Sequence, residues 1–254
     1  MVLFDTHCHL DVDEFAADRD DVLTEARRVG VRDILVPGVS QAGWSALRTF
    51  CEPDPHLHAA LGLHPVYLDQ HRPAHVDGLA REVAADPPLA IGEIGLDYHL
   101  RDLDRAHQRD LLDAQLAIAA DAGLPVVLHC RKAHDDMLQH LRRHALCGGF
   151  CHAFNGSLVQ AERYLALGFC LGFGGMLTFE RSTHLRALAT ALPIDVIVLE
   201  TDAPDMTVAS HRYQRNSPAY LPEILHTLAQ LRGRDEAEVA AQTTANARRV
   251  LMLA

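Results

Sequence analysis

Two histidines stand near the start of the chain, in the segment Asp5-Thr6-His7-Cys8-His9, directly after the apolar run Val2-Leu3-Phe4. If this run is a β-strand, alternate side chains share one face, so His7 and His9 point the same way. Two neutral imidazoles that converge in this way can bind one divalent metal ion. The chain has 17 histidines, so the spacing alone fits two exposed or hydrogen-bonded histidines equally well. The positions of the other candidate ligands decide between these interpretations.

Strand-like and helix-like segments alternate along the chain. Short apolar runs predict β-strands at Val2–Asp5, Asp33–Pro37, Leu57–Leu61, Leu89–Ile94, Pro125–His129, Gly149–His152, Phe169–Phe173 and Asp195–Glu200. Amphipathic spacing predicts helices near residues 19–30, 40–51, 76–86, 104–122, 133–145, 157–167, 181–191, 218–231 and 235–250. This alternation favours one domain over residues 1–254, an α/β fold of the TIM (β/α)8 barrel type. An open doubly wound sheet is the alternative, but no glycine-rich phosphate loop follows the first strand.

In such a barrel the reactive side chains gather at the carboxyl ends of the strands. Four histidines and two carboxylates come to those ends from five different predicted strands: His7, His9, Glu93, His129, His152 and Asp202. Independent structural histidines have no reason to share one rim. The recurrence therefore predicts a metal site at the carboxyl end of the barrel.

Composition limits the class of protein. With 48% hydrophobic residues the chain can build a large core, and no apolar stretch approaches the ~20 residues of a membrane span. A net charge of −11 argues against a broad basic surface that coats nucleic acid, but not against an enzyme that grips one strand end. The six cysteines form no Cys-x-x-Cys pair, and the first residues do not resemble a secretion signal. We therefore expect reduced thiols and a cytoplasmic protein.

Six segments resemble motifs of the TatD family of metal-dependent deoxyribonucleases, in the amidohydrolase superfamily: DTHCHLD, GLHP, IGEIGLDYH, LHCRKAHDD, HAFNGSLVQAER and LETDAPDM. Glu162-Arg163 and Asp205-Met206 resemble its YjjV-like branch in particular. The resemblance extends over nearly the whole chain and implies the same barrel. It also implies two metal ions with these ligands: His7, His9 and Asp202 for the first, His129 and His152 for the second, and Glu93 as the bridge. One departure is Asn155, which stands where the family usually has Ser and bears on a substrate contact rather than on metal binding.

Two divalent ions, Mg, Mn or Zn, would lower the pKa of a bridging water and hold the oxygens of a phosphodiester. The bridging group must be anionic. A lysine carbamate is not available, because the only lysine, Lys132, follows the fifth predicted strand. We therefore expect Glu93 as the bridge, a hydroxide between the ions as nucleophile, and Asp202 as both ligand and general base.

Further side chains are candidates for supporting roles. Glu200 and Asp97 are expected to accept hydrogen bonds from ligand imidazoles. Phosphate contacts are expected from three basic side chains near the rim: His64, Arg131 and His134. Arg131 has an alternative role in an ion pair with Asp135 or Asp136. Tyr98 and Phe154 could stack on a base or simply pack, and Cys8 and Cys130 are expected to be buried.

The favoured function is hydrolysis of phosphodiesters at nucleic-acid ends, as a 3′-5′ exonuclease on single-stranded DNA that can work as a monomer. The same two-metal site could instead act on a small phosphoester, a lactone or an acylated tRNA end, which an acidic surface fits equally well. A third interpretation is a barrel whose metals are structural. A structural site is normally closed and tetrahedral, whereas six ligands from five strands leave open coordination positions.

Overall fold

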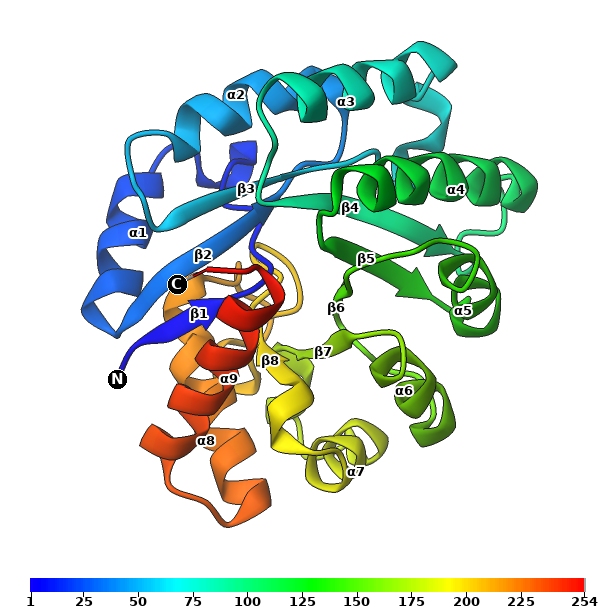
Figure 1. Ribbon diagram of the computed structural model, residues 1–254. Helices are drawn as coiled ribbons and strands as arrows, with labels where there is room; N and C mark the ends of the chain where they lie inside the picture. The colour runs from blue at the N-terminus through cyan, green and yellow to red at the C-terminus, as the bar shows by residue number, and fades with distance from the viewer. Residues whose placement is uncertain (254) are drawn as a thin grey trace.

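Eight parallel strands follow one another around a nearly closed barrel in the computed structural model, which describes residues 1–253 (Figure 1). The strands are β1 (Leu3–Asp5), β2 (Val31–Pro37), β3 (Leu57–Leu61), β4 (Ala90–Asp97), β5 (Val126–Arg131), β6 (Gly149–Cys151), β7 (Phe169–Phe173) and β8 (Ile197–Leu199). Each strand pairs with the next one in the chain. Thr6 links the two end strands, because its N–H and its hydroxyl both donate to the Leu199 carbonyl, at 3.0 and 3.1 Å. The predicted TIM barrel is confirmed.

Helices surround the strands (Figure 1). They are α1 (Arg19–Arg28), α2 (Gln41–Cys51), α3 (Pro73–Ala85), α4 (Arg105–Ala122), α5 (His134–Leu141), α6 (Leu158–Leu165), α7 (Thr183–Ala191), α8 (Leu221–Arg232) and α9 (Glu236–Val250). Short 3-10 turns that the sequence pattern did not predict lie at Asp13–Phe15, Pro65–Gln70, Gly175–Thr178, Ile194–Val196, Ala209–His211 and Pro218–Tyr220. Every strand and helix that the sequence predicted is present within residues 1–253, with shifts of a few residues at the ends.

The core has two parts. The larger part packs the outward side chains of the strands against the helices. The smaller part takes one residue from each strand, among them Phe4, Leu35 and Phe150, and includes Val250 and Leu251 from the end of α9. Because these residues come from every strand and form their own cluster, they fill the interior of the barrel.

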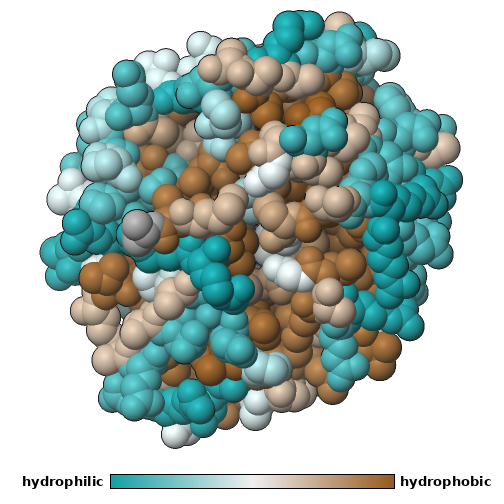
Figure 2. Space-filling view, viewed as in Figure 1, coloured by the Kyte–Doolittle hydropathy of each residue, from teal (hydrophilic) through white to brown (hydrophobic). Residues whose placement is uncertain are grey.

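Helix α9 lies beside β1 and β8, near both chain ends (Figure 1). Asn246 holds it there by donating to the carbonyls of Ile194 and Ile197, both at 2.8 Å, and Thr244 donates to the Val2 carbonyl. These carbonyls precede or begin their strands, so α9 covers the amino end of the barrel. On the face shown in Figure 2, hydrophilic residues gather mainly over the outer parts. None of the described helices combines the length and the apolar character needed to cross a membrane.

Strands β4 and β5 are longer than predicted, reaching Asp97 and Arg131 instead of Ile94 and His129. The ladder continues because Asp97 pairs with Arg131, and the Tyr98 N–H donates to the Arg131 carbonyl at 2.8 Å. Two residues apart on one strand, His129 and Arg131 face the same side. The extension therefore carries an arginine past the end of the barrel, above His129.

Candidate metal centre

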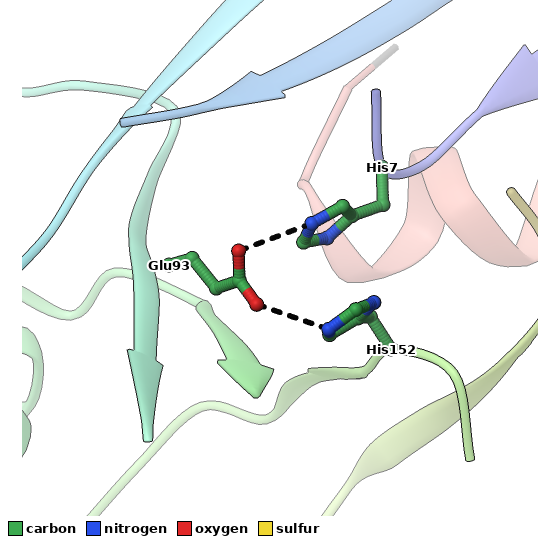
Figure 3. Close-up of side chains that lie close together, drawn as sticks. All are labelled: His7, Glu93 and His152. Atoms are coloured by element: carbon green, nitrogen blue, oxygen red, sulfur yellow. Dashed lines mark ion pairs between the residues drawn. The ribbon is translucent and has the colours of Figure 1, made fainter. Parts of the chain in front are cut away.

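Glu93 lies at the centre of the carboxyl end of the barrel, and each of its carboxylate oxygens meets a different group of histidines. Oε2 is 3.2 Å from Nε2 of His7 and 3.4 Å from Nε2 of His9. Oε1 is 3.1 Å from Nδ1 of His129 and 3.0 Å from Nε2 of His152. Figure 3 shows Glu93 reaching from its strand towards His7 and His152, with one oxygen directed at each ring. This is the geometry expected of a carboxylate that bridges two cations.

Asp202 completes the first group. Its Oδ1 is 3.6 Å from Nε2 of His7 and 3.8 Å from Nε2 of His9. The structure thus brings together all six residues that the sequence predicted as metal ligands. A role as ligands requires that their atoms fit an ion.

The spacing of the imidazole nitrogens provides that test. Nε2 of His7 and Nε2 of His9 are 3.2 Å apart, and Nδ1 of His129 and Nε2 of His152 are 3.3 Å apart. Two ligands that are each about 2.1 Å from one ion, at tetrahedral to octahedral angles, are roughly 3.0–3.4 Å apart. The donor set of nitrogen and carboxylate oxygen also suits Zn or Mn. The residues therefore fit one divalent ion beside each oxygen of Glu93.

Two buried carboxylates, Asp97 and Glu200, lie behind the ligand rings. Oδ2 of Asp97 accepts from Nε2 of His129 at 3.1 Å, which leaves Nδ1 of His129 unprotonated towards Glu93. Oε1 of Glu200 accepts from the Ala153 N–H at 2.6 Å and lies 3.7 Å from Nδ1 of His152. Asp97 thus makes the hydrogen bond that the sequence predicted, whereas Glu200 lies near His152 without bonding to its ring.

Replacing Asp97 by asparagine tests this support. Asp97→Asn removes the charge that fixes the His129 ring, so we expect divalent metal affinity to fall about 10–100-fold. Isothermal titration with Mn²⁺ measures this. The matched control is Asp113→Asn, because Asp113 accepts from Nδ1 of His140 at 2.7 Å on the outer helices. Equal metal affinity in the two variants would show that Asp97 does not orient a ligand.

Asp5, which sequence reasoning did not single out, fixes the loops that carry the first group. Its carboxylate accepts from the N–H of His7 and from both the N–H and the hydroxyl of Thr201. The Asp202 N–H in turn donates to the His7 carbonyl at 2.8 Å. Asp5 is the last residue of β1 and stands two residues before His7, and that spacing is the signal that could have identified it.

The tautomer of His64 decides its role. Its Nε2 is 3.2 Å from Oε1 of Glu93, as close as the candidate ligands. However, the Val66 N–H donates to Nδ1 of His64 at 3.1 Å, so the neutral ring carries its proton on Nε2. Burial lowers the pKa of His64 to about 4, which keeps the ring neutral. His64 is therefore a hydrogen-bond donor facing the centre, which suits the phosphate contact that the sequence predicted.

The two other predicted phosphate contacts differ from each other. Arg131 is exposed, and in the part of the chain that the structure describes no acidic side chain pairs with it. His134 is buried, with Nδ1 3.1 Å from the Tyr164 hydroxyl and Nε2 3.2 Å from Oδ1 of Asn155. A direct contact between His134 and a phosphate would need one of these bonds to break.

The remaining predicted side chains pack. Phe154 is fully buried against His134 and Tyr164, so it does not stack on a base. The Tyr98 hydroxyl donates to Asp136, and the guanidinium of Arg105 covers its ring. Cys8 and Cys130 are buried as expected. Neither cysteine is needed to complete the cluster.

The charges of the cluster are strongly coupled. Burial raises the pKa of Glu93, but the imidazoles of His64, His7 and His152 outweigh it and lower the pKa well below its usual value. Burial lowers the pKa of His9, yet the bond to Glu93 and its charge raise it to about 9. Burial raises the pKa of Asp202 to about 6 against the pull of His152 and His9. At neutral pH a metal ion must displace the proton of His9, so binding releases protons.

Comparison with known proteins gives one consistent result. Residues 4–252 match the family model described as TatD related DNase. The chain is 39% identical to an uncharacterized metal-dependent hydrolase of Escherichia coli, YjjV, over 95% of this chain and 94% of that protein. It is 37% identical to a protein of Erwinia tasmaniensis named 3′-5′ ssDNA/RNA exonuclease TatD, over 99% of this chain and 100% of that one. The crystal structure of E. coli YjjV superposes with a TM-score of 0.95 at 36% identity, over 99% of this chain and 98% of the other.

Proposed function

Because this chain belongs to the TatD-related DNase family, we propose that it is a metal-dependent phosphodiesterase that removes nucleotides from the 3′ ends of single-stranded DNA. The observation that carries the proposal is the position of Glu93, with one oxygen facing each group of histidines. A relative that covers nearly the same length is named an exonuclease of this polarity. The YjjV-like branch predicted from the sequence agrees with the similarity to YjjV.

The two ions would be Mg, Mn or Zn, held by His7, His9, Glu93 and Asp202 on one side and by His129, His152 and Glu93 on the other. When bound, they supply positive charge at the phosphodiester and a water of lowered pKa. The chain itself supplies the base. The side chain of Asp202 is 14% exposed, so it borders the open mouth of the barrel and can accept the proton of the attacking water.

Two donors hold the phosphate against this base. His64 presents its Nε2–H from the β3 side of the centre, as its tautomer requires. Arg131 reaches over the rim from the end of β5 and can contact two phosphate oxygens at once. His134 does not touch the phosphate in this proposal; it is hydrogen-bonded to Oδ1 of Asn155 and holds that side chain in place. Together they fix the phosphorus so that the water attacks in line with the leaving 3′-oxygen.

One chain provides every residue of this site, so the enzyme acts as a monomer in our proposal. All six cysteines are free, and five of them are buried. We place the enzyme in a reducing compartment, the cytoplasm, where unpaired thiols persist.

The net charge of −11 supports a second candidate, in which the same centre hydrolyses a small phosphoester, lactone or acylated tRNA end. A cleavage assay separates the two. Metal-loaded protein should shorten a 5′-labelled single strand one nucleotide at a time, leave blunt duplex largely intact, and lose activity with a chelator. For the one charged contact described, from Arg131, the slope of log affinity against log salt should be about −0.7. Turnover of p-nitrophenyl phosphate without cleavage of any strand would reject the exonuclease in favour of the small substrate.

A further inference from the structure

A cavity of about 320 Å³ opens beside the candidate metal centre, between the residues that follow β6 and β7 and the start of α7. Phe154 and Asn155 line it, but none of the predicted metal ligands, supporting acids or phosphate contacts does. Its wall includes Ala153, which directly follows His152, and Met206, in the loop after Asp202. The wall is therefore one residue from His152, a ligand candidate of the second metal position, and four residues from Asp202, a ligand candidate of the first.

The floor of the cavity is formed by backbone without side chains. Gly172 and Gly174 line it, and a methyl group added at Gly172 would lie only 2.1 Å from Oε2 of Glu200. Glu200 is the acid behind His152. Glycine is needed here because the strand passes directly over a buried carboxylate.

The wall combines apolar surface with a few hydrogen-bonding groups. Met176, Leu185 and Met206 provide the apolar part that a bound group can touch, with the buried Phe154 behind them. Asn155 provides a donor, because His134 occupies its Oδ1 while no group among residues 1–253 accepts from its amide nitrogen. The hydroxyl of Ser182 does not cap α7 and is also available. This lining suits a flat ring with hydrogen-bonding atoms on its edge, such as a nucleobase.

On these grounds we propose that the cavity seats the terminal nucleoside of the strand while its 5′-phosphate lies at the metal centre. The proposal rests on the proposed function and names where the strand end is recognised. At about 320 Å³ the cavity is at the small end of the usual range for ligand sites, so it holds one nucleoside. Water adds to the phosphorus, the bond to O3′ of the preceding nucleotide breaks, and that oxygen takes the proton. A nucleoside 5′-monophosphate is left in the cavity.

The product itself is the probe. Thymidine 5′-monophosphate should bind the Mg²⁺-loaded protein at least tenfold more tightly than inorganic phosphate, measured by isothermal titration calorimetry. Leu185→Trp fills the cavity and should abolish this difference without changing phosphate affinity. Ala187→Trp adds the same side chain to an exposed position of α7 outside the cavity and should preserve it. If Leu185→Trp does not fold, as judged by its melting curve, Thr183→Trp at the rim of the cavity replaces it.

Equal binding of the nucleotide and phosphate by the unmodified protein would overturn the proposal, and so would an undiminished nucleotide preference in the filled variant. These results are separable from the function itself. If the protein degrades single strands but shows no preference for the nucleotide over phosphate, the proposed function stands and the cavity proposal is wrong. If Leu185→Trp abolishes the nucleotide preference but the unmodified protein cleaves no phosphodiester, the cavity proposal stands and the proposed function is wrong.

Discussion

Glu93→Gln is expected to reduce hydrolysis of single-stranded DNA by on the order of 10⁴-fold, because the amide can no longer neutralise two cations at once. An amide has one oxygen and one NH₂ group, so one of the two histidine groups would face a donor instead of an acceptor. Metal analysis should show the loss of at least one ion per chain. Retention of two ions and of full activity would contradict the bridging role.

A control is available at the opposite end of the same barrel. Asp33 is also a buried carboxylate that accepts from two histidines, His56 at 3.0 Å and His58 at 3.1 Å. Asp33→Asn makes the same change from acid to amide in a similar setting, but far from the site. We expect it to retain activity, so a loss seen only in Glu93→Gln reports on the metal centre and not on the removal of a buried charge.

Asp202→Asn is the second variant with a large expected effect, a decrease in kcat of about 10²–10⁴-fold with a smaller change in KM for the strand. The asparagine lacks the basic oxygen that receives the proton of the attacking water. Backbone strain does not complicate the test. Asp202 has φ +57°, and asparagine tolerates this left-handed region as well as aspartate does.

Asp205→Asn supplies the comparison, since Asp205 is an exposed carboxylate three residues along the same loop. Its rate should match that of the unmodified protein within about twofold. Rapid-quench kinetics of a single turnover identify the affected step. A slowed product release with an unchanged chemical step in Asp202→Asn would remove Asp202 from the role of base.

The fold was predictable because its signal is distributed over the chain. Eight apolar runs that alternate with amphipathic helices specify the barrel whatever the exact ends of each strand, and the barrel brings six distant ligands to one rim. The family resemblance added the pairing of those ligands, and the similarity to YjjV confirms the family. The predicted roles of the individual site residues stay predictions; the geometry brings the six candidate ligands together, whereas His134 is held by two other partners.

Other features depend on single contacts that no pattern encodes. The proton position on His64 is set by the Val66 N–H, a bond that exists only once the turn after β3 has formed. The burial of His134 follows from its two partners, Tyr164 and Asn155, which lie on later elements. The cavity beside the centre is a space between three loops and has no sequence signature. All three features depend on how side chains pack in the folded protein, and the periodicity of the sequence does not encode them.

The link between β1 and β8 has a consequence for biosynthesis. Asp5 and Thr201 are 196 residues apart, and their hydrogen bonds join the first and the last strand at the site itself. Before β8 and the residues after it have emerged from the ribosome, the nascent chain has His7 and His9 but lacks Glu200 and Asp202. Under the proposed function, translation must be almost finished before the chain can cut nucleic acid. An interrupted polypeptide that lacks β8 is therefore unable to degrade DNA under this proposal.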